Sequence, residues 1–333
     1  MRYSRTSIVA MLLAVEILIV GLIIFVVRGT FNGGNVFASS GMQRVEFAPT
    51  TLPPIAAGNA PHIVIDDPDS FVTVTTANDG MVRAVDNTHV NGAVWGSAKI
   101  ERLKMERTAD GVRIERPTTA HNFFSLGGID EAIAVTVPSG AYVEIVHSSG
   151  DDVRGLNNRL SVASQDGHIS LAQITGDVDA HSDDGHIDAT DIRGENIKLS
   201  TSDGRLELAN ITADALDAHT NDGRINAREL QIQGASPTAK LHTDDGSVRV
   251  AGRFAAPGSY EVTTNDGRVY LTLVSGSDLT VNASTSDGSL YVDGQSFSGD
   301  GGSTHTARVG NGTGSMRVSS GDGSIHITTN GAF

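Results

Sequence analysis

An acidic side chain recurs at nearly constant intervals through the second half of the chain. It belongs to Asp-Gly pairs whose aspartates are Asp166, Asp184, Asp203, Asp222, Asp245, Asp266 and Asp287. The second residue after each aspartate is basic or a serine: His168, His186, Arg205, Arg224, Ser247, Arg268 and Ser289. A row of carboxylates could hold calcium, which prefers oxygen ligands. The sequence lacks the Gly-Gly-x-Gly-x-Asp repeat of calcium-binding rolls, so we interpret the aspartates as turn formers beside solvated charge.

Histidines form a partial column three residues before the aspartate, at His181, His219 and His242. His219 and His242 belong to consecutive repeats, so their rings could stack or share a metal ion. No carboxylate stands in register with these two rings. We therefore expect a surface row of histidines that gains charge at about pH 6, and no metal site.

Recognised catalytic motifs are missing from the sequence. It has no Gly-x-Ser-x-Gly elbow, no His-Glu-x-x-His helix and no Walker loop. Some parallel β-helices cleave polysaccharides with acidic or basic residues on one strand face, but the recurring carboxylate here lies at a corner. The repeats contain only Tyr260, Tyr270 and Tyr291 as obvious rings for stacking on sugars. We expect no enzymatic activity, and we assign no catalytic, cofactor-binding or metal-binding residue.

Alternating apolar and polar residues on both sides of each Asp-Gly pair must position these columns. Apolar residues stand six and four residues before the aspartate, and three and five residues after it. The residue two before the aspartate always carries a hydroxyl: Ser164, Ser182, Thr201, Thr220, Thr243, Thr264 and Thr285. A spacing of two is the period of a β-strand. Each repeat is expected to form a strand, an Asp-Gly corner, a second strand and a third short apolar stretch.

The corner residues have expected roles of their own. Asp can bond nearby backbone N–H groups, and Gly accepts a positive φ. An inward Ser or Thr beside the corner can bond the turn backbone or the hydroxyl of the next coil.

The repeat length distinguishes stacked coils from hairpins. Successive Asp-Gly pairs are 18, 19, 19, 23, 21 and 21 residues apart, which is the range of solenoids. Asp-Gly also closes two-residue hairpins, but matched columns and three apolar stretches per repeat favour coils. We predict an all-β fold, a parallel β-solenoid (β-helix-like) with coils of about 18–23 residues, preceded by one N-terminal transmembrane α-helix. One coil cannot fold alone, so stability depends on contacts between several coils.

The N-terminal segment Ile8–Val27 is interrupted only by Glu16 and Gly21. As a helix it would span roughly 30 Å, the thickness of the hydrocarbon core of a bilayer. Its apolar side chains favour insertion by more than the carboxylate of Glu16 opposes it. Arg2 and Arg5 precede the segment, so the positive-inside rule favours a cytoplasmic N-terminus and an exported body.

A cleaved signal peptide is the alternative for this segment. The apolar run is longer than a usual h-region, and the nearest small-residue site, Val36-Phe37-Ala38, lies well beyond it. We therefore expect an uncleaved anchor. Glu16 is either a tolerated polar residue or a helix-pairing or functional group inside the membrane.

We divide the chain into six parts. They are a short cytoplasmic tail (1–7), a transmembrane anchor (8–27), a flexible linker (28–60), an irregular β-rich first part or cap of the solenoid (61–146), the regular repeats (147–297) and a last coil with an inserted Gly-rich loop (298–333). Within the cap, the stretch Val90–Ile100 is ambiguous and could hold a short helix. The pair Phe123-Phe124 would either plug the open end of the solenoid or anchor a partner.

Composition limits the function classes. The chain has 333 residues, a formal net charge of −15 and no cysteine. The charge argues against nucleic acid, whose phosphates would be repelled. The absence of cysteine excludes disulfides and thiol chemistry. An aromatic content of 5% argues against a large globular core.

A motif set just before the repeats resembles a known family. The strand Ile133–Val137 ends in Pro138-Ser139-Gly140, Val143-Glu144-Ile145 follows, and Ser149-Gly150-Asp151 opens the Ser/Thr-x-Asp-Gly repeats. Together they resemble the bacterial putative-adhesin family, a domain of unknown function made of β-strand repeats that is also called the toast-rack domain. The resemblance covers about residues 60 to 328 and departs from the family pattern at Asp151-Asp152, where one extra residue precedes the next strand. It implies an extracytoplasmic, usually membrane-attached β-solenoid often associated with envelope functions, with no catalytic residues and no established ligand.

We expect a single-pass cell-membrane protein of bacterial type, with its C-terminal body periplasmic or extracellular. The body would be a non-catalytic structural or adhesin-like binding module at the cell envelope. Its partners would be the membrane, through residues 8–27, and a protein, polysaccharide or cationic peptide, but not nucleic acid. The first alternative is an envelope-stress sensing or regulatory module working through a membrane partner. The second is a carbohydrate-active β-helix enzyme.

Overall fold

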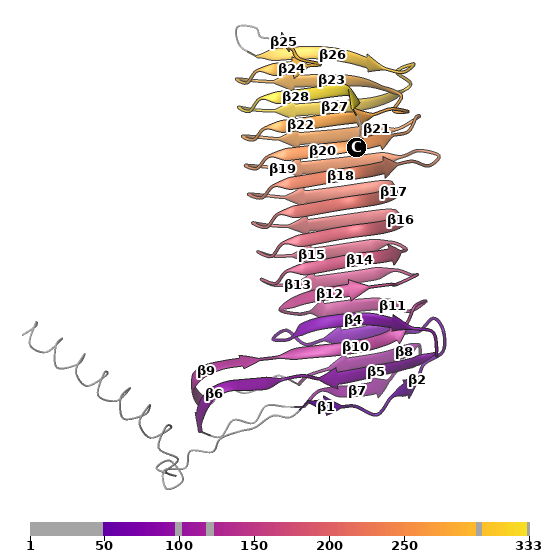
Figure 1. The fold of residues 1–333 in the computed structure, drawn as a ribbon, viewed down its shortest axis with the longest axis vertical. Helices are drawn as coiled ribbons and strands as arrows, with labels where there is room; N and C mark the ends of the chain where they lie inside the picture. The colour runs from indigo at the N-terminus through magenta and orange to yellow at the C-terminus, as the bar shows by residue number, and fades with distance from the viewer. Residues whose placement is uncertain (1–48, 97–101, 118–122, 298–301, 332–333) are drawn as a thin grey trace, which may run out of the picture. The chain divides into compact units, whose positions relative to one another are not determined.

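The computed structural model describes residues 49–96, 102–117, 123–297 and 302–331, which form strands and turns (Figure 1). The expected anchor 8–27, with Glu16, lies outside these residues. No helix within the described ranges is long and apolar enough to cross a membrane. The described residues fall into a large compact unit and a smaller one that contains 90–96 and 123–129.

The large unit is a column of stacked coils with a ladder of strands on each of two faces. The first face contains, in spatial order, β7 (Lys104–Arg107), β8 (Gly111–Glu115), β3 (His62–Asp66), β11 (Tyr142–His147), β13 (Leu160–Ser164), β15 (Val178–Ser182), the second half of β16 (Ile187–Thr201), the second half of β17 (Leu206–Thr220), β19 (Thr238–Thr243), β21 (Ser259–Thr264), β27 (Gly314–Ser320), β23 (Leu279–Thr285) and β26 (Ser303–Val309).

The second face contains the partner strands of the same coils. Its order is β1 (Thr50–Thr51) and β2 (Ile55–Ala56) on β5 (Met81–Asp86), then β10 (Ala132–Pro138), β4 (Phe71–Ala77), β12 (Gly150–Arg154), β14 (Ile169–Thr175), the first halves of β16 and β17, β18 (Ile225–Ile232), β20 (Val248–Phe254), β22 (Val269–Val274), β28 (Ile325–Gly331), β24 (Leu290–Val292) and β25 (Gln295–Phe297).

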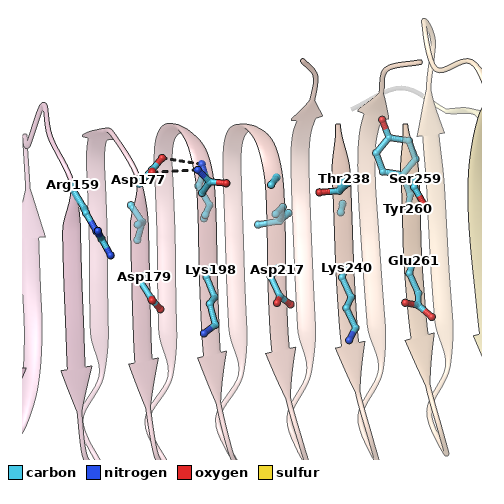
Figure 2. Close-up of a pocket in the computed structure, with 16 residues that line it drawn as sticks. Arg159, Asp177, Asp179, Lys198, Asp217, Thr238, Lys240, Ser259, Tyr260 and Glu261 are labelled. Atoms are coloured by element: carbon cyan, nitrogen blue, oxygen red, sulfur yellow. Dashed lines mark hydrogen bonds between the residues drawn. The ribbon is translucent and has the colours of Figure 1, made fainter. Parts of the chain in front are cut away.

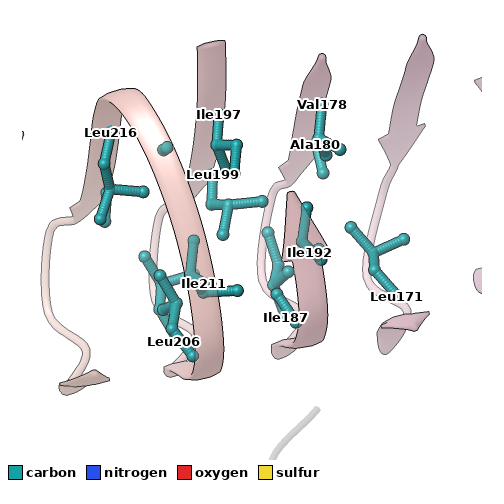
Figure 3. Close-up of a cluster of buried hydrophobic side chains, with 14 of the residues drawn as sticks. Leu171, Val178, Ala180, Ile187, Ile192, Ile197, Leu199, Leu206, Ile211 and Leu216 are labelled. Atoms are coloured by element: carbon teal, nitrogen blue, oxygen red, sulfur yellow. The ribbon is translucent and has the colours of Figure 1, made fainter. Parts of the chain in front are cut away.

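The core lies between the two faces and consists of apolar columns in register. Leu160 pairs with Val178, and Val178 pairs with Ile197, so like residues lie directly over one another. Ile187 and Leu206 form an equivalent column on the second face. All five side chains are buried, and Figure 3 shows several of these residues pointing into the space between the faces. These columns confirm the predicted all-β stack of parallel coils.

The hydroxyl column joins each corner to the corner of the preceding coil. Thr220 Oγ1 accepts a hydrogen bond from Gly223 N at 3.2 Å and donates one to the carbonyl oxygen of Gly204 at 2.9 Å. The same two bonds recur at Ser182, Thr201, Thr243, Thr264, Thr285 and Ser320. The prediction that this hydroxyl bonds the turn backbone is therefore confirmed.

The expected reasons for Asp and Gly at the corner are wrong. The corner glycines are not among the residues with positive φ in the described chain. They are needed because neighbouring coils approach closely: a Cβ on Gly246 would lie 1.5 Å from the carbonyl oxygen of Gly223. The N–H of the corner glycine bonds the hydroxyl and not the aspartate, and the aspartate side chains, such as those of Asp203 and Asp222, are exposed.

Positive φ occurs instead at a second corner, seven residues after the aspartate. The residues there are not glycine: Gln173 (56°), Asp191 (56°), Asn210 (53°) and Glu229 (56°). This left-handed conformation costs an L-residue about 1–2 kcal/mol. The cost recurs in successive coils because this turn links the second strand to the third apolar stretch.

We expect Glu229→Gly to raise the free energy of unfolding by about 0.5–1 kcal/mol, because glycine adopts the 56° φ without a steric cost. Urea unfolding followed by circular dichroism measures this. The control is Arg228→Gly, at an exposed neighbouring residue without positive φ. This variant should lower the free energy of unfolding by a comparable amount. A loss of stability in both variants would contradict the assignment.

The last coil of the sequence is not the last coil of the column. β27 lies between β21 and β23, with Met316 in register with both Tyr260 and Val281. β28 lies between β22 and β24 in the same way. The antiparallel β26 covers the outer edge of β23. This corrects the expected placement of 298–333: its coil is inserted between two earlier coils, because matching columns allow a coil to pair with either neighbour.

The opposite end is interleaved in the same manner. β3 lies between β8 and β11, and β4 lies between β10 and β12. Antiparallel strands close this end too, since β7 pairs with β8 and β5 pairs with β10. Short antiparallel strands at both ends take the place of a long parallel edge, which would invite pairing with another chain.

β6 (His89–Gly96) and β9 (Phe123–Asp130) form a two-stranded sheet, and all but the first residue of β6 and the last residue of β9 belong to the smaller unit. The ambiguous stretch Val90–Ile100 therefore begins as a strand, and the short helix considered for it is not found in 90–96. β-Branched and aromatic residues such as Val94 and Trp95 favour a strand. The choice between plug and partner anchor for Phe123-Phe124 stays a prediction.

Candidate functional site

The histidine column lies on the first face and is bonded within the chain. His219 and His242 stack with ring centroids 5.3 Å apart. Both nitrogens of His242 have partners: Nδ1 lies 2.7 Å from Thr263 Oγ1, and Nε2 lies 3.2 Å from Asp244 Oδ1. The described residues contain no group of three or more His, Asp or Glu side chains that could hold a metal ion. Stacking, one of the two arrangements considered for these rings, is thus found.

The corner aspartates form an exposed ridge with one carboxylate per coil. Neighbouring coils are about 4.8 Å apart, and calcium takes roughly six to eight oxygen ligands. A single row of carboxylates at that spacing offers too few oxygens to enclose the ion.

We expect millimolar calcium to leave the melting temperature of the protein essentially unchanged, because the ridge does not form a coordination shell. Differential scanning calorimetry of the EDTA-treated protein, with and without calcium chloride, measures this. A rise of several degrees that EDTA reverses would overturn the interpretation of the ridge as solvated turn residues.

An aromatic ladder lies on the second face near the C-terminal end of the column. The guanidinium of Arg249 lies 4.8 Å from the ring centroid of Tyr270. His326 stacks between Tyr270, at 5.1 Å, and Tyr291, at 4.6 Å. The ring faces therefore cover one another. Tyr260 is only 3% exposed and bonds the carbonyl oxygen of Ala255. Each of the tyrosines considered for sugar stacking, Tyr260, Tyr270 and Tyr291, therefore has at least one ring face covered by the protein itself.

A shallow groove crosses the first face over the coils from β15 to β21 (Figure 2). Its lining combines edges of the inward column, such as Ile197 and Leu216, with outward charged side chains, such as Lys198 and Asp217. Figure 2 shows these charged side chains in a row along adjacent strands. The groove is open and polar at its rim, which suits a surface contact better than the enclosure of a small molecule.

A buried ionic cluster lies at the N-terminal end of the column. Arg116 is 7% exposed and reaches Asp67 Oδ2 at 2.8 Å, both carboxylate oxygens of Asp86 at 3.1 Å and Glu131 Oε2 at 3.2 Å. Burial raises the pKa of Asp67 in spite of Arg116. Burial alone would also raise the pKa of Asp86, but hydrogen bonds from Arg116 and Thr88 lower it. The cluster ties together the ends of β3, β5 and β8 and the start of β10, so we interpret it as structural.

A second buried acid lies alone in an apolar column. Asp151 is in register with Val72 on one side and Ile169 on the other, and its side chain is fully buried. Ser148 Oγ donates a hydrogen bond of 2.7 Å to Asp151 Oδ2, whereas Oδ1 has no partner in the described structure. Burial raises the pKa of Asp151 to about 7.

Comparison with known families identifies the column. The sequence profile of a family described as Toastrack DUF4097 matches residues 61–328. The chain belongs to the Toastrack family. The match confirms the resemblance inferred from the motif set at Ile133–Asp151, and its limits agree with the stretch of about 60 to 328. The matched residues include the β6–β9 sheet and the coil column except for β1, β2 and the last residues of β28.

Two solved structures resemble the Toastrack chain. One is a putative cell adhesion protein from Clostridium sporogenes, with 10% identity, 84% of this chain and 99% of that chain covered, and a TM-score of 0.24. The other is a putative adhesin from Bacteroides fragilis, with 10% identity, 84% and 97% coverage, and a TM-score of 0.34. No curated protein matches the chain.

Sequence reasoning missed the interior charged groups of the Toastrack domain. Arg116, Asp67 and Asp86 lie outside the regular repeats, where no column marks which residues turn inward. Asp151 carried a signal, because the extra residue at Asp151-Asp152 was visible as a departure from the family pattern. The structure shows its effect: the acid takes the position that Ile169 and equivalent apolar residues occupy in later coils.

Proposed function

We propose that this Toastrack protein is a non-catalytic binding module of the cell envelope, anchored by residues 8–27 and displayed outside the cytoplasmic membrane. The observation that supports it is the pair of flat strand faces, on which every second residue points outward over many coils. Solenoid faces of this kind give extended surfaces for contact with large partners. The apolar segment at the start of the sequence supplies an anchor.

The chemistry of the faces supports binding over catalysis. The outward side chains are hydroxyls, amides and charges of both signs, and the first-face groove is shallow. The acids that surround Arg116, which are Asp67, Asp86 and Glu131, have buried side chains and are used in ion pairs within the chain. The partner we propose is a macromolecule at the envelope: a protein, a polysaccharide or a cationic peptide.

Topology is the first test of the proposal. Alkaline phosphatase fused after Phe333 should be active, because that enzyme folds only outside the cytoplasm, whereas a green fluorescent protein fusion at the same position should be dark. The membrane fraction should contain the full-length chain. A fluorescent fusion with inactive phosphatase would place the body inside and sink the proposal.

Catalysis and binding are tested separately. A reducing-sugar screen with the full chain should show no release from envelope polysaccharides. Affinity capture from solubilised membranes should recover surface polymer or a surface protein. Stoichiometric recovery of a transmembrane regulator would instead favour the envelope-sensing alternative.

A further inference from the structure

One outward column on the first face carries charges that alternate in sign from coil to coil. In spatial order its members are Asp179, Lys198, Asp217, Lys240, Glu261 and Arg317, each in register with the next. The residues that flank the column are uncharged, Ser161 at one end and Asn282 at the other. We call these six residues the charge ladder. At about 4.8 Å per coil it is roughly 24 Å long.

The interleaved C-terminal coil completes the charge ladder. In sequence order the residue after Glu261 would be Asn282, which belongs to the next Asp-Gly coil. Insertion of β27 places Arg317 next to Glu261 instead. The ladder therefore begins with a negative charge, ends with a positive charge and has an even number of members.

The ladder side chains are exposed or half-buried, and they are not used within the chain. None of the six makes a side-chain hydrogen bond, and none makes an ion pair within 4.0 Å, in the described structure. Alternation lowers repulsion within one column. It also leaves positive and negative side chains available to a partner whose charges alternate in sign with the same spacing, one charge per coil.

A second copy of the chain has that period. When an even, alternating ladder is reversed, every negative charge faces a positive one. In an antiparallel pair Asp217 lies opposite Lys240 of the partner copy, Lys198 lies opposite Glu261, and Asp179 lies opposite Arg317. A parallel pair in register would place like charges opposite one another, and a parallel pair displaced by one coil would leave an end charge of each copy unmatched. The antiparallel pair matches all six charges on both copies, so the ladder favours that arrangement.

The neighbouring column is compatible with this arrangement. Two residues before the ladder, the outward side chains are Asp177, Asn196, Ala215, Thr238, Ser259 and Ser315. The same reversal places Asp177, the one charge among them, opposite Ser315. Its carboxylate is already bonded to Asn196, at 2.9 Å from N and 3.3 Å from Nδ2. No like charges in this column are therefore brought together.

We propose that two copies of the protein associate antiparallel through the charge ladder on the first face. The contact is about 24 Å by 17 Å, or about 400 Å² per copy, which is roughly half that of a stable specific interface. Exposed ion pairs are individually weak and screened by salt. The association is therefore transient and salt-sensitive, and many copies on a surface strengthen it by multivalency.

The antiparallel arrangement separates the points at which the two chains enter their columns. The chain enters the column at β1, at the end opposite to β26. Two paired columns therefore have their entry points at opposite ends.

Charge reversal at the centre of the ladder tests the pairing. Sedimentation of the full chain in detergent should show a dimer at 20 mM salt that dissociates at 500 mM. The Debye length is roughly three times its physiological value at the lower salt concentration and about half of it at the higher one. Asp217→Lys and Lys240→Glu should each weaken the dimer at least tenfold, since each places like charges at the two-fold axis. The double variant D217K/K240E should restore the dimer, because opposite charges face each other again.

A matched control makes the same charge change elsewhere. Glu207→Lys lies on the second face and should leave association unchanged. The restored double variant shows that neither substitution prevents folding. A wild-type chain that stays monomeric at low salt, single reversals that associate like wild type, or a double variant that fails to recover would each overturn the proposal.

Cross-linking tests the direction of the pair in a chain that has no cysteine of its own. A mixture of Asp179→Cys and Arg317→Cys chains should cross-link through a short thiol reagent, whereas either chain alone should not. Self-cross-linking of Asp179→Cys would show parallel pairing and contradict the proposal. These measurements are made on the purified chain without a membrane. A cytoplasmic body in the fusion test would therefore contradict the proposed function but not the proposed pairing.

Discussion

Gly223→Ala is expected to destabilise the column by about 3 kcal/mol or more. The added Cβ would lie 1.7 Å from the carbonyl oxygen of Gly204 and 2.5 Å from Thr220 Oγ1. The first of these atoms is backbone, so the clash is relieved only by moving two coils apart. That movement also breaks the bonds of Thr220 to Gly223 N and to the Gly204 carbonyl. Urea unfolding followed by circular dichroism measures the loss.

A second glycine separates close approach from backbone conformation. Gly294 has φ +80° and nothing within 4 Å of an added Cβ. Gly294→Ala is therefore expected to cost only the left-handed conformation, about 1–2 kcal/mol. Equal losses at Gly223 and Gly294 would refute the view that the corner glycines are required by contact between neighbouring coils.

Asp151→Asn is expected to stabilise the protein above about pH 7 and to remove a pH dependence. Burial raises the pKa of Asp151 to about 7, whereas an unfolded aspartate titrates at about 3.9. The folded state thus binds the proton more tightly than the unfolded state. The contribution of Asp151 to the free energy of unfolding is therefore most favourable below about pH 4, falls as the pH rises, and levels off above about pH 7. Three pKa units correspond to about 4 kcal/mol.

Asparagine keeps an oxygen that can accept the bond from Ser148 and carries no charge to bury. The gain over wild type should therefore be several kcal/mol at pH 8 and small at pH 4. Urea unfolding at both pH values measures it. Asp152→Asn is the control, since Asp152 points outward and pairs with Arg154 at 2.8 Å. The same gain at both pH values would contradict a buried, proton-binding carboxyl at position 151.

Much of the fold follows from local pattern. The period-two columns predicted the strands, their inward faces and the register of the regular coils, because alternate residues of a strand point to opposite sides. The inward hydroxyl at Thr220 and its equivalents was also predicted, together with its bond to the turn. The stacking of His219 on His242 followed from their equal positions in consecutive coils.

The candidate surfaces were predictable only in part. The alternation from Asp179 to Glu261 is readable in the repeat columns, but its extension to Arg317 depends on the inserted coil. The aromatic ladder likewise needs His326 between Tyr270 and Tyr291, which are consecutive in the sequence pattern. The family pattern marked Asp151-Asp152 as a departure, but only the register of β12 with β4 and β14 shows that Asp151 faces the core.

The sequence by itself determined the repeating coil, the side of each strand that faces the core, and the family to which the chain belongs. Only the tertiary structure decided the order of the coils at both ends, the closeness of neighbouring corners and the environment of each interior acid. The reason is physical. The period and the inward face of a strand are set by neighbours along the chain, whereas the order of the coils is set by hydrogen bonds between distant segments. The entropy of closing the intervening loop varies only slowly with its length, so loop length does not show with which coil a distant segment pairs.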